Sequence, residues 1–198
     1  MRNLIVPLII SLVLLLSGSC SKTYTPKPRG YFHITFPEKA YQPFPDPAPF
    51  RFEYPLYARV IPDLSPNAEP WWMDLSIDQN KARIHLSYKA VDGNLDVLTE
   101  DSRDLAYKHT LKASSINEKF FANPEQKVYG ILFEIKGNAA SPFQFHLTDS
   151  LHHFIRGSLY IREIPNYDSL YPVITFLKED LIHLVETFSW SDHAPDPE

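Results

Sequence analysis

The sequence predicts an α+β domain, in which a mainly antiparallel sheet is covered by two long amphipathic helices. The first observation is a run of three segments between residues 130 and 163 in which apolar and polar side chains alternate. Such alternation is typical of strands with one buried face, and turn-forming residues between the segments favour an antiparallel meander. The second observation is the helical spacing of apolar residues on either side of this meander, at 94–112 and 169–188.

The residues of the predicted meander separate onto two faces. The apolar face is expected to carry Ile131, Phe133, Ile135, Phe143, Phe145, Leu147, Ile155, Leu159 and Ile161. The opposite face is expected to carry Glu134, Lys136, Gln144, His146, Thr148, Arg156, Ser158 and Arg162. This polar face is compatible with a solvated sheet, with a cover formed by the aromatic N-terminal segment, or with a docking surface.

Turn residues and helix caps place the remaining elements. A hairpin is predicted at 71–88, a short strand at 115–120, and edge strands at 31–36 and 50–54. Asn94 is the expected N-cap of the first helix, and Ser169 that of the second, with Pro172 in its first turn. Two helices that flank a meander in sequence resemble the Mog1/PsbP-like layered sandwich at the level of fold alone.

The N-terminus has the pattern of a lipoprotein signal peptide at residues 1–19. Arg2 precedes an apolar run at 4–16 that is too short to span a bilayer as a helix, and small residues follow it. Cys20 comes next and is the single cysteine of the chain, so we expect it to be lipidated. The alternative is an ordinary signal peptide and an unmodified thiol, because Ser17 stands where such motifs usually carry leucine. Two or three acyl chains would hold the mature protein stably on a membrane.

Composition divides the rest of the chain into a tether, one domain and a tail. Residues 20–28 are expected to form the lipidated cysteine and its tether, and residues 191–198 a flexible tail. Residues 29–190 are expected to form a single α+β domain. Its N-terminal part is rich in proline and also in aromatic residues. Disordered linkers are poor in aromatic residues, so we expect this part to be extended chain packed on the domain.

The sequence has no strong pattern for nucleic-acid binding, metal binding or catalysis. Its net charge is −5 and it has no basic stripe, so nucleic acid is not an expected partner. Asp149, His152 and His153 surround one predicted turn, but their spacing matches no metal-binding motif. No G-x-S-x-G sequence supports a serine nucleophile. We therefore expect no catalytic residue, no metal and no cofactor.

Seven residues are candidates for a partner-binding surface. Most come from the polar face of the meander, one lies in a charged run of the first helix, and one belongs to a Trp-Trp pair that a single strand face cannot bury. They are Glu134, Gln144, His146, Arg156, Ser158, Arg103 and Trp72. An alternative use of the same region is a small-ligand pocket between sheet and helix, lined by His146, Arg156 and Glu134.

Seven segments in order carry a family resemblance over nearly the whole mature chain. They are PKPRGYFHITFPEKAY (26–41), FEYPLYARV (52–60), IHLSYK (84–89), EDSRDLAYKHTLKA (100–113), VYGILFEIKGNAASPFQFHLTDS (128–150), HFIRGSLYI (153–161) and PNYDSLYPVI (165–174). With these segments the sequence resembles the gliding-motility lipoprotein GldD family of the Bacteroidota. The resemblance implies membrane attachment, a role in gliding and in the associated type IX protein secretion machinery, and no known catalytic residue.

The expected function is therefore that of a lipid-anchored, non-enzymatic accessory protein. It would act by contact with protein components of the gliding and secretion machinery, from the periplasmic side of the outer membrane. The alternative is a periplasmic small-ligand-binding protein or enzyme with a pocket between sheet and helix. A deep apolar cavity with convergent polar groups would favour that alternative.

Overall fold

The computed structural model describes residues 34–45 and 47–191. The predicted signal peptide, Cys20 and the tether lie outside these residues, and so does the tail at 192–198. The chain from Thr35 onward forms one unit by its backbone contacts. All strands and helices named here belong to that unit.

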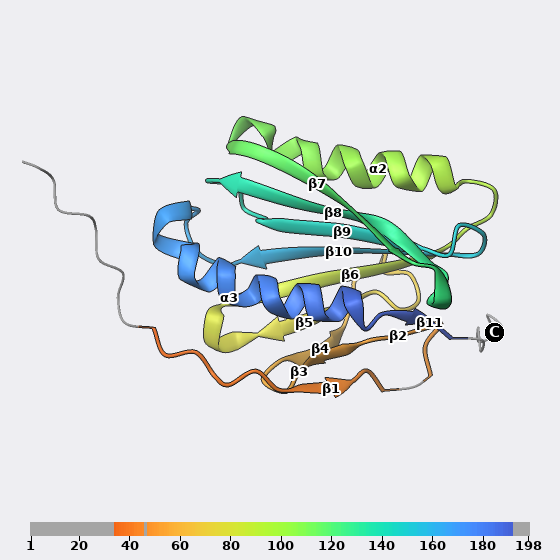
Figure 1. Ribbon diagram of the computed structural model, residues 1–198, viewed down its shortest axis with the longest axis horizontal. Helices are drawn as coiled ribbons and strands as arrows, with labels where there is room; N and C mark the ends of the chain where they lie inside the picture. Colours follow the sequence, from red (N-terminus) through yellow and green to blue (C-terminus); the bar gives the residue numbers. More distant parts are fainter. Residues whose placement is uncertain (1–33, 46, 192–198) are drawn as a thin grey trace, which may run out of the picture. The chain divides into compact units, whose positions relative to one another are not determined.

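Seven strands form one antiparallel sheet in the order β4-β5-β6-β10-β9-β8-β7 (Figure 1). Their bounds are Arg59–Pro62 (β4), Met73–Ile77 (β5), Ala82–Ala90 (β6), Ala113–Asn123 (β7), Val128–Gly137 (β8), Phe143–Thr148 (β9) and His153–Ile161 (β10). The predicted hairpin is confirmed as β5 and β6, and the predicted meander as β8, β9 and β10. The strand predicted at 115–120 is longer than expected, and β4 was not predicted.

Two helices accompany the sheet, so the predicted α+β class is confirmed. They are α2 (Leu95–Tyr107) and α3 (Tyr167–Glu186), with short 3-10 turns η1 (Asp78–Asn80), η2 (Lys108–Leu111) and η3 (Pro124–Gln126). Asn94 is the N-cap residue of α2, but its side chain accepts from the N–H of Asp92 outside the helix. The prediction for α3 is wrong by three residues, because the side chain of Asn166 caps the helix by accepting from the N–H of Ser169 at 3.2 Å. Pro172 consequently lies inside α3 and not in its first turn.

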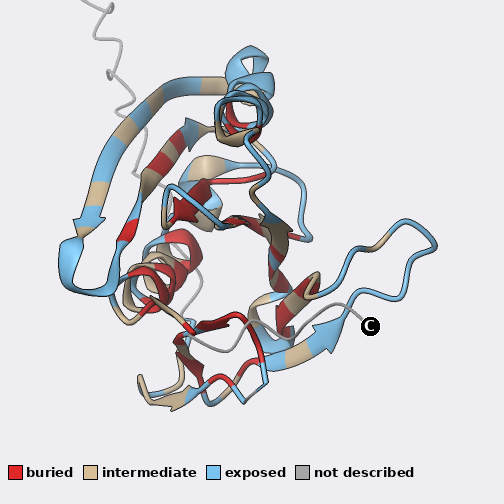
Figure 2. Cartoon of the chain, turned by 90° about the vertical axis from the view of Figure 1, so that its right-hand side faces the viewer, coloured by how far each residue is buried: buried red, intermediate tan, exposed pale blue. Residues whose placement is uncertain are grey.

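The helices cover opposite faces of the sheet, and this explains why β9 is buried at every position and β10 at most of its positions. On one face, Leu177, Leu181 and Leu184 of α3 join the large hydrophobic core with buried residues of β5, β6, β8, β9 and β10. On the other face, Ala106 of α2 packs with Phe133 of β8 in a smaller core. Buried residues therefore concentrate on α3 and on the sheet beside it (Figure 2).

The first strand of the meander faces the opposite way from the prediction. Phe133 lies opposite Gln144 and Glu134 lies opposite Phe143, and residues opposite each other on antiparallel strands share a face. The expected apolar residues of β8 therefore face α2, whereas those of β9 face α3. The prediction that β8 has one apolar and one polar face is wrong, because both of its faces are covered. Leu132, which alternates with Phe133, is part of the α3-side core.

The aromatic N-terminal segment closes the core on the α3 side and does not cover the polar face of the meander. Phe44, Phe50 and Phe52 are buried, and the rings of Phe50 and Phe188 lie 5.9 Å apart. This segment holds short strands in two-stranded sheets: β1 (Tyr41–Pro43) with β3 (Glu53–Pro55), and β2 (Phe50–Arg51) with β11 (Ser189–Trp190). The described part of this segment thus packs on the core through its aromatic side chains.

Its strand boundaries differ from the prediction. Residues 34–36 are not in a strand, and the first strand of the segment begins at Tyr41. The strand expected at 50–54 is interrupted at Phe52, a buried residue that lies between β2 and β3. Proline has no backbone N–H to donate, and within residues 41–55 it occurs at Pro43, Pro45, Pro47, Pro49 and Pro55. This favours short strand pairings over one long strand.

Candidate functional site

A groove of about 340 Å³ runs between α2 and the neighbouring part of the sheet. We call it the α2 groove. It exists because α2 packs on β9 and β10, which leaves the α2-side face of β5 and β6 less covered. Its lining includes Trp72, Asp74, His85, Leu98, Leu105 and Arg156. Two of the candidate partner-binding residues thus come together at this groove: Arg156 from β10, and Trp72 from the turn before β5.

A polar cluster lies between α2 and the meander beside this groove. It consists of Ser102, Gln144, His146, Arg156 and Ser158. Ser102 belongs to α2 and faces the sheet, where its hydroxyl lies 3.1 Å from Nδ1 of His146. An Nη atom of Arg156 donates to Oε1 of Gln144. Register explains the cluster, because Gln144 lies opposite Ser158 and His146 lies opposite Arg156 on the paired strands β9 and β10.

Three of these residues are too deeply buried to form the expected docking surface. Gln144 and Ser158 are each 1 % exposed and His146 is 3 % exposed. The prediction of an accessible polar face is wrong for them, because α2 covers that face of β9 and β10. Polar residues on a strand can indicate solvent or a buried network, and the sequence pattern alone does not separate the two.

Burial controls the electrostatics of the cluster. It lowers the pKa of His146 to about 4, and the positive charge of Arg156 adds to that effect. Burial also lowers the pKa of Arg156. Among the described residues, no carboxylate lies within ion-pair distance of the Arg156 guanidinium. The cluster therefore holds a permanent positive charge in a poorly solvated place.

The other candidate residues lie elsewhere. Glu134 faces α3, where its carboxylate accepts from Lys178 at 2.9 Å, so it lines neither the groove nor the cluster. Arg103 is on the exposed side of α2 and pairs with Glu118 of β7 at 3.3 Å. Trp72 donates through Nε1 to the carbonyl of Tyr88 at 2.9 Å, which fixes its ring at the mouth of the groove.

A second candidate surface, the β7 edge, was not recognised from the sequence. The strand has eleven residues and none of them is buried. In the described part of the chain β7 pairs with β8 alone, so its other edge has no strand partner. Phe120 projects from it with 84 % of its surface exposed. The sequence signal was the pair Phe120-Phe121 within a run of polar residues.

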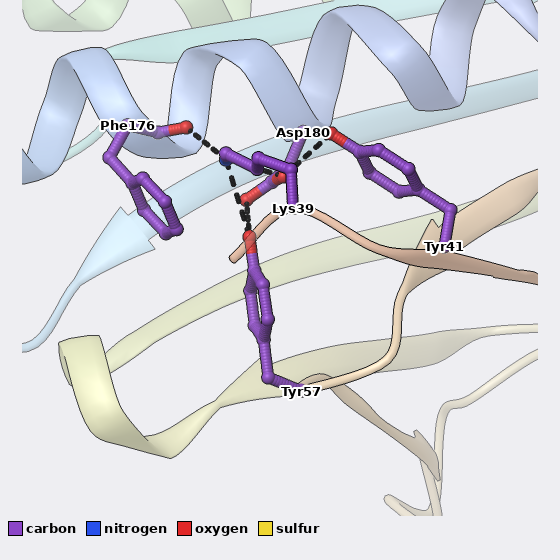
Figure 3. Close-up of polar contacts among 5 residues, drawn as sticks. All are labelled: Lys39, Tyr41, Tyr57, Phe176 and Asp180. Carbon is purple, nitrogen blue, oxygen red and sulfur yellow. Dashed lines mark hydrogen bonds and ion pairs between the residues drawn. The ribbon is translucent and has the colours of Figure 1, made fainter. Parts of the chain in front are cut away.

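A third feature is a buried carboxylate that ties the N-terminal segment to α3 (Figure 3). The side chain of Asp180 has no exposed surface, and it accepts from Lys39 Nζ at 2.6 Å. It also accepts from the hydroxyls of Tyr41 at 3.1 Å and Tyr57 at 2.6 Å. The same Lys39 ammonium donates to the carbonyl of Phe176 at 2.7 Å and lies over its ring. We call this set the Asp180 clamp.

The clamp holds its tyrosines in the protonated form. Burial, together with the carboxylate of Asp180, raises the pKa of Tyr41 to about 12 and that of Tyr57 further. Both hydroxyls are thus permanent donors to Asp180 at physiological pH. The clamp is a structural device, because every polar atom of the carboxylate is already engaged by these donors.

A family model described as gliding motility lipoprotein GldD matches residues 21–190. The chain belongs to the GldD family. The match spans every element described above, so the groove, the β7 edge and the clamp all lie within the region that defines the family. The family description supports an accessory role in gliding motility and attachment to a membrane of the cell envelope.

The solution structure of cyanobacterial PsbP (CyanoP) from Synechocystis sp. PCC 6803 is similar with a TM-score of 0.47 and 9 % sequence identity, over 81 % of this chain and 98 % of that chain. A search of curated proteins gives no match.

The turn that suggested a metal site has another explanation. Oδ1 of Asp149 accepts from the backbone N–H groups of Leu151, His152 and His153, at 2.8 to 3.0 Å. This carboxylate therefore organises the turn between β9 and β10. Within residues 34–45 and 47–191, no three His, Cys, Asp or Glu side chains gather as metal ligands would. No helix in the same ranges has the length and apolar character needed to cross a membrane.

Proposed function

We propose that this protein is a lipid-anchored, non-enzymatic accessory factor of gliding and of the associated type IX secretion machinery. Acyl chains on Cys20 hold it on the inner leaflet of the outer membrane, and the folded unit faces the periplasm. There it acts through contact with protein components of the machinery. Membership of the gliding motility lipoprotein family supports the setting, and the β7 edge supports contact as the mode of action.

The β7 edge is the observation that carries this proposal. Proteins usually protect the edges of a sheet with short strands, proline or bulges, because an open edge pairs readily with another chain. The opposite edge of this sheet follows that rule, since β4 has four residues and ends at Pro62. By contrast β7 has eleven residues without proline, and its irregularity is confined to its start, between Ala113 and Ser115.

The side chains of β7 indicate what would bind there. Glu118 is held by Tyr107 and Arg103 of α2, and Lys119 lies 3.8 Å from Glu134, so the two charges of the strand are already satisfied. Phe120 has no such cover. An extended segment of a partner protein that pairs with β7 and places an apolar residue against Phe120 would satisfy the open backbone groups and bury the ring.

Lipidation is tested by replacing Cys20 with serine. We expect the Cys20→Ser variant to lose all incorporation of labelled palmitate and to fractionate away from membranes, since one thiol is the whole attachment site. Cells that carry it should spread on agar no better than a deletion strain. Ser21→Ala is the matched control and should behave as the wild type. Normal labelling and normal spreading of the Cys20→Ser strain would overturn the proposal.

A further inference from the structure

Arg156 carries a charge that no carboxylate of the described residues meets at ion-pair distance. Its guanidinium sits under α2, its one hydrogen-bond partner is the neutral amide of Gln144, and no carboxylate among the described residues pairs with it. Neutral His146 and the half-buried His109 are the titratable groups on neighbouring elements that sense this charge. A poorly solvated charge without a counter-charge is costly, and a bound anion would offset that cost.

Other polar atoms beside Arg156 also lack partners. Nε of Arg156, Nε2 of Gln144 and the hydroxyl of Ser158 are buried, and none has a hydrogen-bond partner in the described structure. The two nitrogens are donors without an acceptor. Gln144 and Ser158 are each more than nine-tenths buried, so these are features of a built site and not of a mobile surface. These donors call for an acceptor, and the charge of the Arg156 guanidinium favours one that is negatively charged.

The α2 groove gives an anion access to the Arg156 side chain, which is part of its lining, whereas Gln144 and Ser158 lie behind Arg156 and do not line the groove. The walls of the groove are mostly apolar and include Leu86, Leu98, Leu105 and Phe154. Its volume of about 340 Å³ is at the lower end of the range for small-ligand sites. Hence the space beside the guanidinium suits a small apolar body.

Acidic side chains at the groove select among anions. Asp63, Asp74 and Asp101 line it, and Asp74 is the one that is engaged by basic side chains, those of Arg83 and His85. A doubly charged phosphate would be repelled by these carboxylates more strongly than a single carboxylate would. Lys89 does not offset them, because it is paired with Glu69.

We propose that the α2 groove binds a single carboxylate attached to a small apolar body, with Arg156 as the residue that pairs with the carboxylate. A free short-chain carboxylic acid or an acidic side chain of a peptide presents this same chemistry. The residues of this site are other than those of the β7 edge and other than Cys20. Its test therefore leaves the proposed function untouched.

The test uses the full lipoprotein purified in detergent, with arginine labelled with ¹⁵N. Butanoate and its neutral counterpart butanamide are titrated while the Nε–H signals of the arginine side chains are followed by NMR. The Arg156 signal, assigned by its loss in Arg156→Gln, should shift saturably with butanoate and at least tenfold less with butanamide. The Arg103→Gln variant, changed on the outer side of α2, should bind butanoate as the wild type does.

Two further arms identify the source and the class of the anion. Acetyl-Leu-Glu-Leu-amide is compared with its Gln counterpart, and inorganic phosphate is titrated alone. Preference for the Glu peptide over butanoate assigns the site to an acidic side chain, and the reverse assigns it to a free acid. Equal response to butanoate and butanamide, or a stronger response to phosphate, overturns the proposal. Where Arg156→Gln does not fold, Arg156→Lys, which keeps the charge, assigns the Arg156 signal, and the contrast between butanoate and butanamide is still measured on the wild type.

Discussion

Replacing Asp180 with alanine should lower the free energy of unfolding by about 3 kcal/mol. The carboxylate has no exposed surface and accepts from three side chains that hold the N-terminal segment on α3 (Figure 3). Its loss leaves the hydroxyls of Tyr41 and Tyr57 without an acceptor and leaves the Lys39 ammonium, which is 23 % exposed, without a counter-charge. Guanidinium denaturation of the variant and of the wild type measures the difference.

Two variants separate the clamp from a general effect on α3. Glu179 is the preceding residue and is exposed, so Glu179→Ala should change the free energy of unfolding by less than about 0.5 kcal/mol. The double variant Lys39→Met with Asp180→Leu removes both charges and should be more stable than Asp180→Ala alone. A loss below about 1 kcal/mol in Asp180→Ala would show that the clamp does not hold the segment.

Acidification from about pH 6.5 to about pH 4 should remove about 3 kcal/mol of stability through His146 alone. Burial holds its pKa at about 4 in the folded protein, against 6.5 for an ordinary histidine. Between these values the unfolded chain binds a proton and the folded chain does not, so stability falls as the pH falls. Above pH 6.5 both states are neutral at His146 and this contribution to the pH dependence is absent.

The contribution of His146 is isolated by comparison with a variant. Arg156 of β10 disfavours the protonated form, Glu118 of β7 favours it, and Ser102 of α2 contacts the ring. In His146→Gln, the free energy of unfolding that is lost between pH 6.5 and pH 4 should be about 3 kcal/mol smaller than in the wild type. His152→Gln, at an exposed position, should have the same slope of stability against pH as the wild type. Equal slopes in all three proteins would mean that His146 is not held neutral by burial.

The fold class follows from the sequence because period 2 and period 3.6 are both clear in it. The strands of the hairpin and the meander and both helices lie where those periods place them. The sequence does not predict which face of β8 is turned to α2 and which to α3, because the neighbouring residues Leu132 and Phe133 are both apolar and each packs in a core. Alternation identifies a buried face only where the other face is solvated, and here α2 and α3 cover one face each.

The candidate site was predictable only as a set of residues. Gln144, His146, Arg156 and Ser158 do lie together, as their positions on paired strands indicated. Their burial depends on α2, which packs over them from more than forty residues away in sequence. One feature of the sequence indicates the Asp180 clamp: an aspartate stands among the buried apolar residues of α3, between Leu177 and Leu184. Its three donors come from a separate segment, which no local pattern connects to it.

The most direct test of contact as the mode of action is photo-crosslinking from the β7 edge in living cells. A photo-reactive amino acid is placed at Phe120, and at Leu64 as a control that is equally exposed but lies before β5. Light should link position 120, and not position 64, to a component of the gliding or secretion machinery, identified by mass spectrometry. Equal products from both positions, or no such component from position 120, would contradict it.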